Sequence, residues 1–155
     1  MTDPTTIHDT FIIERRYAKS PAQVFAALGD PASKRRWYAA TAETFDMDFR
    51  VGGREYTQSR MGTDTPFPGT ALVSDAVYQD IVPDGRVVLA QTMTLGERHI
   101  SSALLTFELL AEGGGTTLIC THQAVFYQPS DGPERRKGGW EVLFGRLDVL
   151  LAEAA

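Results

Sequence analysis

The chain has 155 residues, 43% of them hydrophobic and 23% charged, a balance typical of one globular domain and too apolar for general disorder. Its formal net charge of −5, from 15 basic and 20 acidic residues, disfavours binding to nucleic acid or to an anionic membrane surface. Cys120 is the single cysteine, which excludes an intrachain disulfide, and no signal-like start or membrane-length apolar run is present, so we expect a cytoplasmic protein without membrane insertion.

The N-terminal quarter of the chain predicts a flexible tail, one strand and two short helices. Residues 1–8 are mostly polar and form the expected tail, whereas residues 10–17, TFIIERRY, mix β-branched, aromatic and charged side chains as a half-buried strand does. Ser20 followed by a proline is a helix start, and the apolar positions after it predict a helix up to Gly29. Asp30 followed by another proline predicts a second short helix that ends at the pair WY.

From residue 43 the apolar positions recur every two residues, which indicates strands. Residues 43–50 alternate aromatic or apolar with polar side chains, a glycine pair supplies a tight turn, and residues 55–61 form the expected returning strand. The loop signal PFPG leads into a strand over residues 70–82, and the turn PDG leads into another over residues 87–95.

The C-terminal part predicts a hairpin and a long helix. Residues 99–110 and 116–127 flank the turn EGGG, which pairs residue 111 with residue 116 and places His122 opposite Leu105. Residues 134–154 carry apolar side chains at three- and four-residue steps and predict an amphipathic helix.

The order of these elements predicts one α+β domain over residues 1–155. We expect a seven-stranded curved antiparallel sheet wrapped on the long C-terminal helix, with two short helices after the first strand. One helix cannot fill the concave side of such a twisted sheet, so space should remain between the helix and the strands.

Five blocks spread over nearly the whole chain resemble successive segments of the SRPBCC superfamily, the START-like and birch-pollen-allergen-like helix-grip proteins. They are TFIIERRYAKSPAQVFAALGDPASKRRWY, FRVGGREY, IVPDGRVVLAQTM, GGGTTLICTHQAVF and GGWEVLFGRLDVLL. The branch that they resemble is the bacterial one named after the activator of heat-shock-protein-90 ATPase. The resemblance implies a deep cavity under the C-terminal helix, which relatives use for lipids, sterols, polyketides and other apolar ligands, and it implies no shared catalytic motif. Where relatives often carry an aromatic residue in the fifth strand, this chain has Gln91, which makes the expected pocket more polar.

Strand alternation and helix periodicity predict the side chains that line this cavity. The wall is mainly apolar with a few polar groups, as in many ligand pockets, although a packed core with mutually satisfied polar groups has the same composition. The predicted lining residues are Trp37, Phe45, Met47, Tyr56, Gln58, Arg60, Phe67, Leu89, Gln91, Met93, His99, Ser101, Leu105, Phe107, Cys120, His122, Phe126, Trp140, Phe144 and Leu147.

Two charged residues have alternative interpretations within this cavity. Arg60 either binds the anionic head group of a ligand or extends its stem to reach water at the strand end. Asp75 is the one acidic residue that alternation places inward, with Val73 and Val77, where a carboxylate near His122 would act as a general base.

Cys120 and His122 share one predicted strand face, but the sequence offers no third ligand, so we expect neither a metal nor a cofactor. Trp140 follows Gly138 and Gly139 in the last helix, and we expect it to be a core anchor rather than a ligand-stacking group. The two glycines permit either close approach to the sheet or a flexible gate. The cluster at residues 135–137, RRK, is expected to be a solvated face.

Three functions fit these predictions. The first is a carrier or sensor that binds a small hydrophobic or amphipathic molecule in the cavity, and the second is a cyclase, dehydratase or hydrolase that uses the same cavity. The third is a co-chaperone-like interaction module with an exposed apolar patch. A free strand edge would also permit a homodimer, and no nucleic-acid partner is expected.

Overall fold

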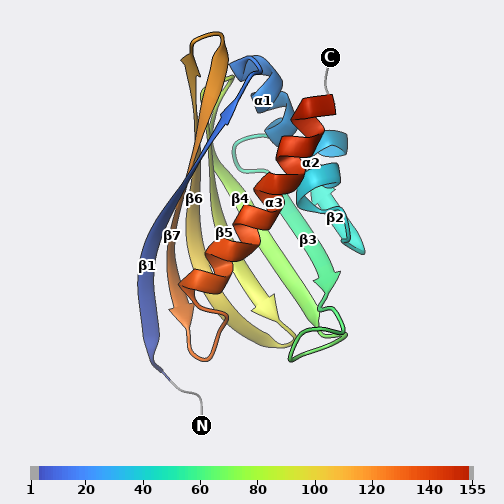
Figure 1. The fold of residues 1–155 in the computed structure, drawn as a ribbon. Helices are drawn as coiled ribbons and strands as arrows, with labels where there is room; N and C mark the ends of the chain where they lie inside the picture. The colour runs from blue at the N-terminus through green and yellow to red at the C-terminus, as the bar shows by residue number, and fades with distance from the viewer. Residues whose placement is uncertain (1–3, 154–155) are drawn as a thin grey trace.

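The structure, a computed structural model, describes residues 4–153 and consists of one sheet and three helices (Figure 1). The elements in chain order are β1 (Thr6–Tyr17), α1 (Pro21–Gly29), α2 (Pro31–Tyr38), β2 (Thr44–Met47), β3 (Arg54–Arg60), β4 (Ala71–Val82), β5 (Arg86–Leu95), β6 (Arg98–Glu112), β7 (Gly115–Tyr127) and α3 (Pro133–Glu153). The predicted α+β helix-grip architecture is confirmed. No helix among residues 4–153 is long and apolar enough to cross a lipid bilayer.

The seven strands form one antiparallel sheet in the order β1-β7-β6-β5-β4-β3-β2. The β6–β7 hairpin has the predicted register, since Ala111 pairs with Thr116 and His122 lies opposite Leu105. The first strand begins earlier than expected, at Thr6, because residues 6–8 pair with the end of β7. The prediction of a flexible tail over residues 1–8 is therefore wrong for residues 6–8. Residues 1–3 lie outside the described part of the chain.

Two adjacent N-caps fold the segment after β1 into a helical elbow. The Ser20 hydroxyl accepts a hydrogen bond from the backbone N–H of Gln23, whose side chain accepts one from the Ser20 N–H, so a capping box starts α1. Asp30 ends α1 and caps α2 by accepting from the Ser33 N–H, and each helix has a proline at its first position. The elbow holds α2 beside α3, at the end of the sheet where β2 begins.

The long helix α3 crosses the concave face of the sheet diagonally (Figure 1). Its apolar stripe is Trp140, Phe144, Leu147 and Leu151, which are at most 5% exposed. Trp37 of α2 is fully buried against Phe144, and its indole N–H donates to the Ala27 carbonyl at 2.8 Å. These contacts place the hydrophobic core between α3, the elbow and the inner face of the sheet, from β1, β7 and β6 to parts of β5 and β4.

Candidate ligand-binding site

Residues directly opposite each other in neighbouring strands share a face of the sheet, so the register identifies the inner face. Under α3 this face is closely packed. The predicted lining residues on it that are at most 3% exposed are Leu89, Ser101, Leu105, Phe107, Cys120, His122 and Phe126. Leu89, Leu105, Phe107 and Cys120 belong to the same hydrophobic cluster as the apolar stripe of α3, and the Phe107 ring lies 5.9 Å from that of Trp140 between centroids. The structure therefore places these residues together as core.

One part of the inner face on β2 to β5 is partly open to solvent, although other inward residues of these strands, such as Glu55, Tyr78 and Leu89, are buried. We call it the open inner surface and define it as Phe45, Thr57, Ser59, Leu72 and Met93, all half-buried. Their side chains share one face because Phe45 pairs with Thr57, Thr57 with Ser74, Ser74 with Met93, and Leu72 with Ser59. Figure 1 shows that α3 runs diagonally toward α1 and α2 and does not lie over the end of the sheet where β3 ends and β4 begins. Met47, the next inward residue of β2, is half-buried and packs against the core.

The predicted orientation of β3 is wrong, because the inward side chains are Glu55, Thr57 and Ser59. Tyr56 instead lies on the outer face, where its ring is 4.7 Å from the Arg54 guanidinium and its hydroxyl donates to Gln58 at 3.2 Å. In the segment REYTQSR, Tyr56 is the only large apolar side chain, so alternation alone could not set the phase of this strand. Gln58, two residues after Tyr56 on the same strand, also lies on the outer face.

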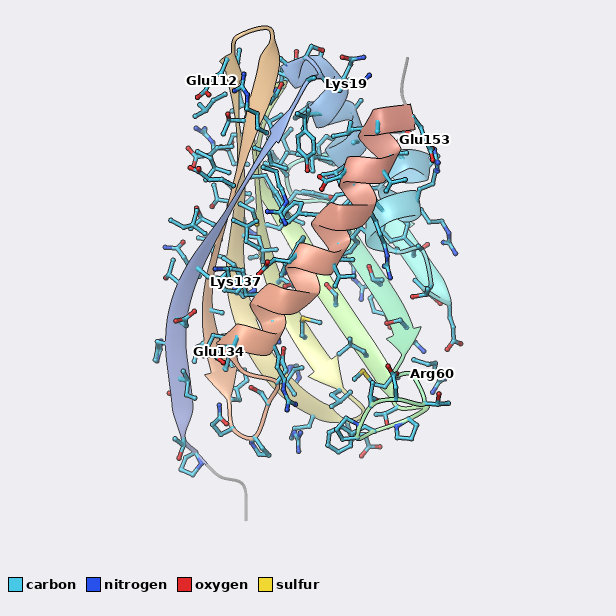
Figure 2. All side chains as sticks on the ribbon, in the orientation of Figure 1. Lys19, Arg60, Glu112, Glu134, Lys137 and Glu153 are labelled. Atoms are coloured by element: carbon cyan, nitrogen blue, oxygen red, sulfur yellow. The ribbon has the colours of Figure 1, made fainter. Side chains whose placement is uncertain are left out.

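The predicted inward orientation of Arg60 is wrong, and the alternative, in which it reaches water at the strand end, agrees with the structure: its side chain is 53% exposed and pairs with Glu43 at 2.7 Å. It also donates to the Gly69 carbonyl at the end of β3, beside the loop that leads to β4 (Figure 2). Asp75 faces outward too and accepts two hydrogen bonds from Arg54 at 2.8 Å, which lower the pKa of its carboxyl. Arg60 therefore offers no interior anion site, and Asp75 cannot act as a base beside His122.

Two other predicted residues lie away from the inner surface. The pairing of β5 with β6 is irregular after Met93, because Ser101 pairs with Met93 and His99 pairs with Thr94. Ile100 is the extra residue and is buried, whereas His99 is exposed. Phe67 lies in the loop between β3 and β4 and is 49% exposed.

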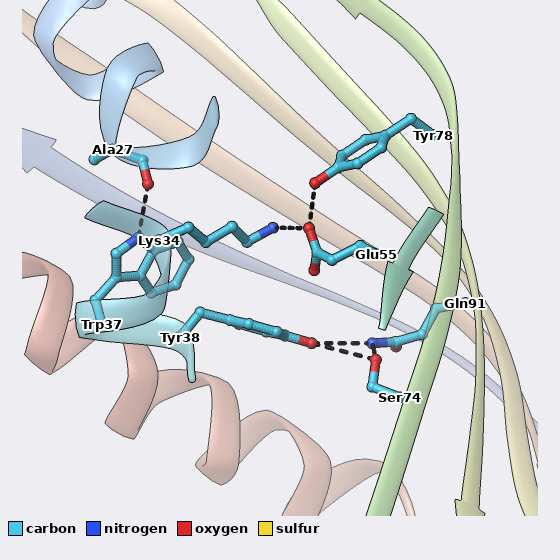
Figure 3. A network of polar contacts seen from close by, with 8 residues as sticks. All are labelled: Ala27, Lys34, Trp37, Tyr38, Glu55, Ser74, Tyr78 and Gln91. Carbon is cyan, nitrogen blue, oxygen red and sulfur yellow. Dashed lines mark hydrogen bonds and ion pairs between the residues drawn. The ribbon is translucent and has the colours of Figure 1, made fainter. Parts of the chain in front are cut away.

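Two polar clusters connect α2 to the inner face (Figure 3). In the first, the Lys34 ammonium lies 2.6 Å from the Glu55 carboxylate, both side chains are 3% exposed, and the Tyr78 hydroxyl donates to the same carboxylate oxygen. In the second, the Gln91 amide N–H donates to Ser74 at 2.7 Å and to the Tyr38 hydroxyl at 3.4 Å. The Lys34 ammonium lies 4.9 Å from the centre of the Tyr38 ring, so the two clusters adjoin.

Both tyrosines of these clusters remain protonated. Burial, followed by the negative charge of Glu55, raises the pKa of Tyr38 and that of Tyr78 well above the ordinary value. Their hydroxyls therefore act as hydrogen-bond donors or acceptors and not as acids at neutral pH.

Two polar atoms beside the open inner surface are buried without a partner among residues 4–153. They are the amide oxygen of Gln91, whose side chain is 6% exposed, and the hydroxyl of Thr57. Buried polar groups almost always have hydrogen-bond partners, and a buried donor or acceptor left without a hydrogen bond costs about 1–3 kcal/mol. The position of Gln91 confirms that a polar group faces inward on the fifth strand, and the next inward residue of that strand is Met93 of the open inner surface.

His122 is fully buried on the inner face, stacked on Phe11 with a ring-centroid distance of 4.4 Å. Neither ring nitrogen has a hydrogen-bond partner among the described residues. Burial, followed by the positive charge of Arg136, lowers the pKa of His122 to about 4, so the imidazole is neutral at pH 7. Cys120 shares this face, and burial raises the pKa of its thiol to about 12, which makes the thiolate inaccessible. No three His, Cys, Asp or Glu side chains of residues 4–153 cluster as metal ligands.

The prediction that residues 135–137 form a solvated face is wrong for Arg136, which is buried. Its neighbours Arg135 and Lys137 are exposed. The Arg136 side chain is 7% exposed, forms two hydrogen bonds to the Asp131 carboxylate at 2.8 and 2.9 Å, and donates to Ser101 at 2.9 Å. Its guanidinium lies 5.0 Å from the centre of the Phe126 ring. It thus joins the first turn of α3 to β6 and to the loop after β7.

The two glycines near this turn do not serve close packing. A methyl group built at Gly138 or Gly139 would meet no atom within 4 Å, apart from neighbouring residues and the backbone of the helix itself. The close-approach interpretation of these glycines is therefore wrong, and the gate interpretation stays a prediction.

Two hollows lie outside the inner face. One, of about 440 Å³, lies between the elbow and the C-terminal end of α3, where the Arg36–Glu153 ion pair forms part of its lining. The other, of about 470 Å³, is a shallow depression on the outer face of β1, β7 and β6, lined by residues such as Thr10, Leu104 and Gln123.

Several important residues were missed by the sequence analysis, and two of them had a usable signal. Arg136 precedes Trp140 by four residues, and the run 136, 140, 144, 147 and 151 is one continuous helical face. Lys34 likewise lies three and four residues before Trp37 and Tyr38. Glu55, Thr57 and Ser74 had no such signal, because β3 carries one large apolar residue and β4 carries them on both faces.

Comparisons with known proteins identify the family. The model of the activator of Hsp90 ATPase homolog 1-like family matches residues 18–152. A solved protein of Rhizobium leguminosarum shares 36% identity over 97% of this chain and 98% of its own, with a TM-score of 0.90. A solved protein of Rhizobium loti shares 39% identity over 94% of this chain and 99% of its own, with a TM-score of 0.86. CalU16 of Micromonospora echinospora has a similar fold, with a TM-score of 0.66. It shares 19% identity over 99% of this chain and 87% of its own. No curated protein matches. The chain belongs to the activator of Hsp90 ATPase homolog 1-like family of the SRPBCC superfamily.

Proposed function

We propose that the protein binds a small, mostly apolar molecule on the open inner surface, as a carrier or sensor. The observation that carries this proposal is the contrast between two parts of the inner face. Inward side chains such as Phe107, Cys120 and His122 are at most 1% exposed, whereas the five side chains of the open inner surface are half-buried. The next inward residue of β5 after Met93 is Gln91, whose amide oxygen is buried without a partner among residues 4–153. An apolar wall with a few oriented polar groups is the usual composition of a small-molecule site.

An enzymatic role has less support. His122 is the one histidine on the inner face, yet it makes no hydrogen bond to an acid among the described residues, and the nearby Asp131 is already paired with Arg136. A neutral imidazole whose pKa is about 4 is a weak general base at neutral pH. Binding without turnover therefore needs fewer assumptions.

Protein interaction is a second candidate, favoured by one observation. Four large apolar side chains of the outer face, Ile12, Val77, Leu104 and Leu110, are 40–55% exposed. The family takes its name from an activator of Hsp90 ATPase, so purified Hsp90 is the natural partner with which to test this surface. Binding of Hsp90 that is lost in a Leu104→Lys variant would favour this function.

The binding proposal is tested by fluorescence titration with N-phenyl-1-naphthylamine, a neutral dye that brightens in apolar surroundings. We expect saturable binding at one site per chain. A Leu72→Trp variant should reduce the affinity at least about tenfold, because the larger ring occupies the open inner surface.

The matched control is Val73→Trp, since Val73 is the next residue of β4 and lies on the opposite face of the sheet. It should leave the affinity unchanged. Absence of saturable binding, or equal losses in both tryptophan variants, would refute the proposed site.

A further inference from the structure

Resting on the proposed function, we infer that the guest is an uncharged molecule with a hydrogen-bond donor, such as a hydroxyl, that binds the Gln91 amide oxygen. The inference concerns the chemical class of the ligand and the residue that selects it.

The charge balance of the interior disfavours an ionic guest. Lys34, Glu55 and Arg136 are the buried charged side chains of residues 4–153. Lys34 pairs with Glu55 at 2.6 Å, and Arg136 pairs with Asp131 at 2.8 Å. Because each of these charges is already matched, a carboxylate or ammonium on the guest would lose its hydration without gaining a free counter-charge.

The polar atoms at the site favour a donor on the guest. The Gln91 amide nitrogen already donates to Ser74 and Tyr38, which fixes the orientation of the amide and leaves its oxygen as a pure acceptor. The Thr57 hydroxyl, on the same face, is also unpartnered among the described residues. A hydroxyl on the guest can donate to the amide oxygen and accept from Thr57, which satisfies both atoms.

The surroundings of these atoms require an apolar body for the guest. Phe45, Leu72 and Met93 supply aromatic and aliphatic surface on the same face, and Ser74 pairs with Thr57 on one side and Met93 on the other. A flat apolar ring system with one hydroxyl therefore matches the open inner surface.

The test compares three naphthalenes that differ in one substituent, using equilibrium dialysis at pH 7 with detection by naphthalene fluorescence. They are 2-naphthol, a neutral donor; 2-methoxynaphthalene, which cannot donate; and 2-naphthoate, an anion. We expect 2-naphthol to bind about tenfold more tightly than 2-methoxynaphthalene, as one hydrogen bond to a buried acceptor allows, and 2-naphthoate to bind most weakly.

A Gln91→Leu variant should reduce the ratio of the 2-naphthol and 2-methoxynaphthalene affinities to about one, and Thr57→Val should reduce it in part. The control Gln58→Leu makes the same change on the outer face of β3 and should keep the wild-type ratio. Equal affinities in the wild type, tightest binding of 2-naphthoate, or an unchanged ratio in Gln91→Leu would overturn the inference while leaving the proposed function intact. If none of the three compounds binds, the proposed function fails as well.

Discussion

Lys34 places a basic side chain in the interior of the protein, where it pairs with Glu55. A buried ion pair is not by itself stabilising, because both ions lose hydration, but removing one partner leaves an uncompensated charge. The main effect of the Lys34–Glu55 pair is therefore to fix the position of α2 relative to β3. It holds α2 at a fixed distance from β3, and so holds the adjoining Tyr38 against Ser74 and Gln91.

A Lys34→Met variant tests this link. We expect the free energy of unfolding, measured by urea denaturation, to fall by about 3–5 kcal/mol because the Glu55 carboxylate is left buried without a counter-ion. Adding Glu55→Gln should restore much of the loss, since the amide still accepts from Tyr78. An Arg54→Met control, which breaks an exposed ion pair, should have little effect. A small effect of Lys34→Met would show that the interior is more hydrated than this account requires.

His122 predicts the pH dependence of stability. Its pKa is about 4 in the folded protein and about 6.5 in the unfolded chain, so the unfolded state binds the proton more tightly. The stability associated with the neutral imidazole is complete above about pH 6.5 and is lost as the pH falls to 4, at a total cost of about 3 kcal/mol.

Urea denaturation at several pH values should show that His122→Phe removes this part of the acid sensitivity. The exposed position His99 supplies the control, and His99→Phe should keep the wild-type pH profile. Identical profiles for the two variants would mean that His122 is not held in its neutral form.

At the residue scale the sequence analysis was accurate wherever a strand is strongly apolar. In β5 and β7 the inward residues were identified correctly from Leu89, Gln91, Cys120 and His122, because large apolar neighbours set the phase. In β3 the phase was inverted, because a single aromatic side chain, Tyr56, is stabilised on the outer face by Arg54. A cation–aromatic contact of this kind depends on the tertiary structure and cannot be predicted from the alternation of apolar and polar residues in the sequence.

At the scale of elements, α3 is unusual in carrying Gly138, Gly139 and Gly145 within one helix. Glycine in a helix interior costs about 1 kcal/mol relative to alanine, and here no tight contact requires it. The N-terminal half of α3, which includes Arg136, is therefore intrinsically weaker than its packing alone would suggest.

Alanine substitutions test this weakness. Gly138→Ala and Gly145→Ala should each raise the free energy of unfolding by about 1 kcal/mol, measured by chemical denaturation. Gly53→Ala is the contrasting control and should be destabilising, because its methyl group would overlap the Asp48 carbonyl oxygen. Loss of stability in Gly138→Ala would reveal a contact or conformation that these glycines require.

The elements themselves were predictable because turns and caps are local. Ser20 and Asp30 mark both helix starts, and the glycine turn before Gly115 sets the register of the last hairpin. The irregular pairing at Ile100 was not predictable, since an extra residue in one strand leaves the composition of both strands unchanged. This single shift exposes His99.

At the scale of the whole molecule, one diagonal helix covers a seven-stranded sheet unevenly. The hydrophobic core lies under α3 and the elbow and reaches β4 and β5, whereas the open inner surface on β2 to β5 keeps five inward side chains that are only half-buried. The sequence predicted incomplete filling from the ratio of helix to sheet, but not which strands would remain open, because that depends on the direction in which α3 crosses.

The most direct test of the account is a two-dimensional NMR titration of the labelled protein with 2-naphthol. The account predicts that the largest chemical-shift changes belong to the Gln91 side-chain amide and to the backbone amides of Thr57, Ser74 and Met93. Changes confined to the outer depression near Leu104 and Gln123, or to the hollow near Leu150, would contradict it.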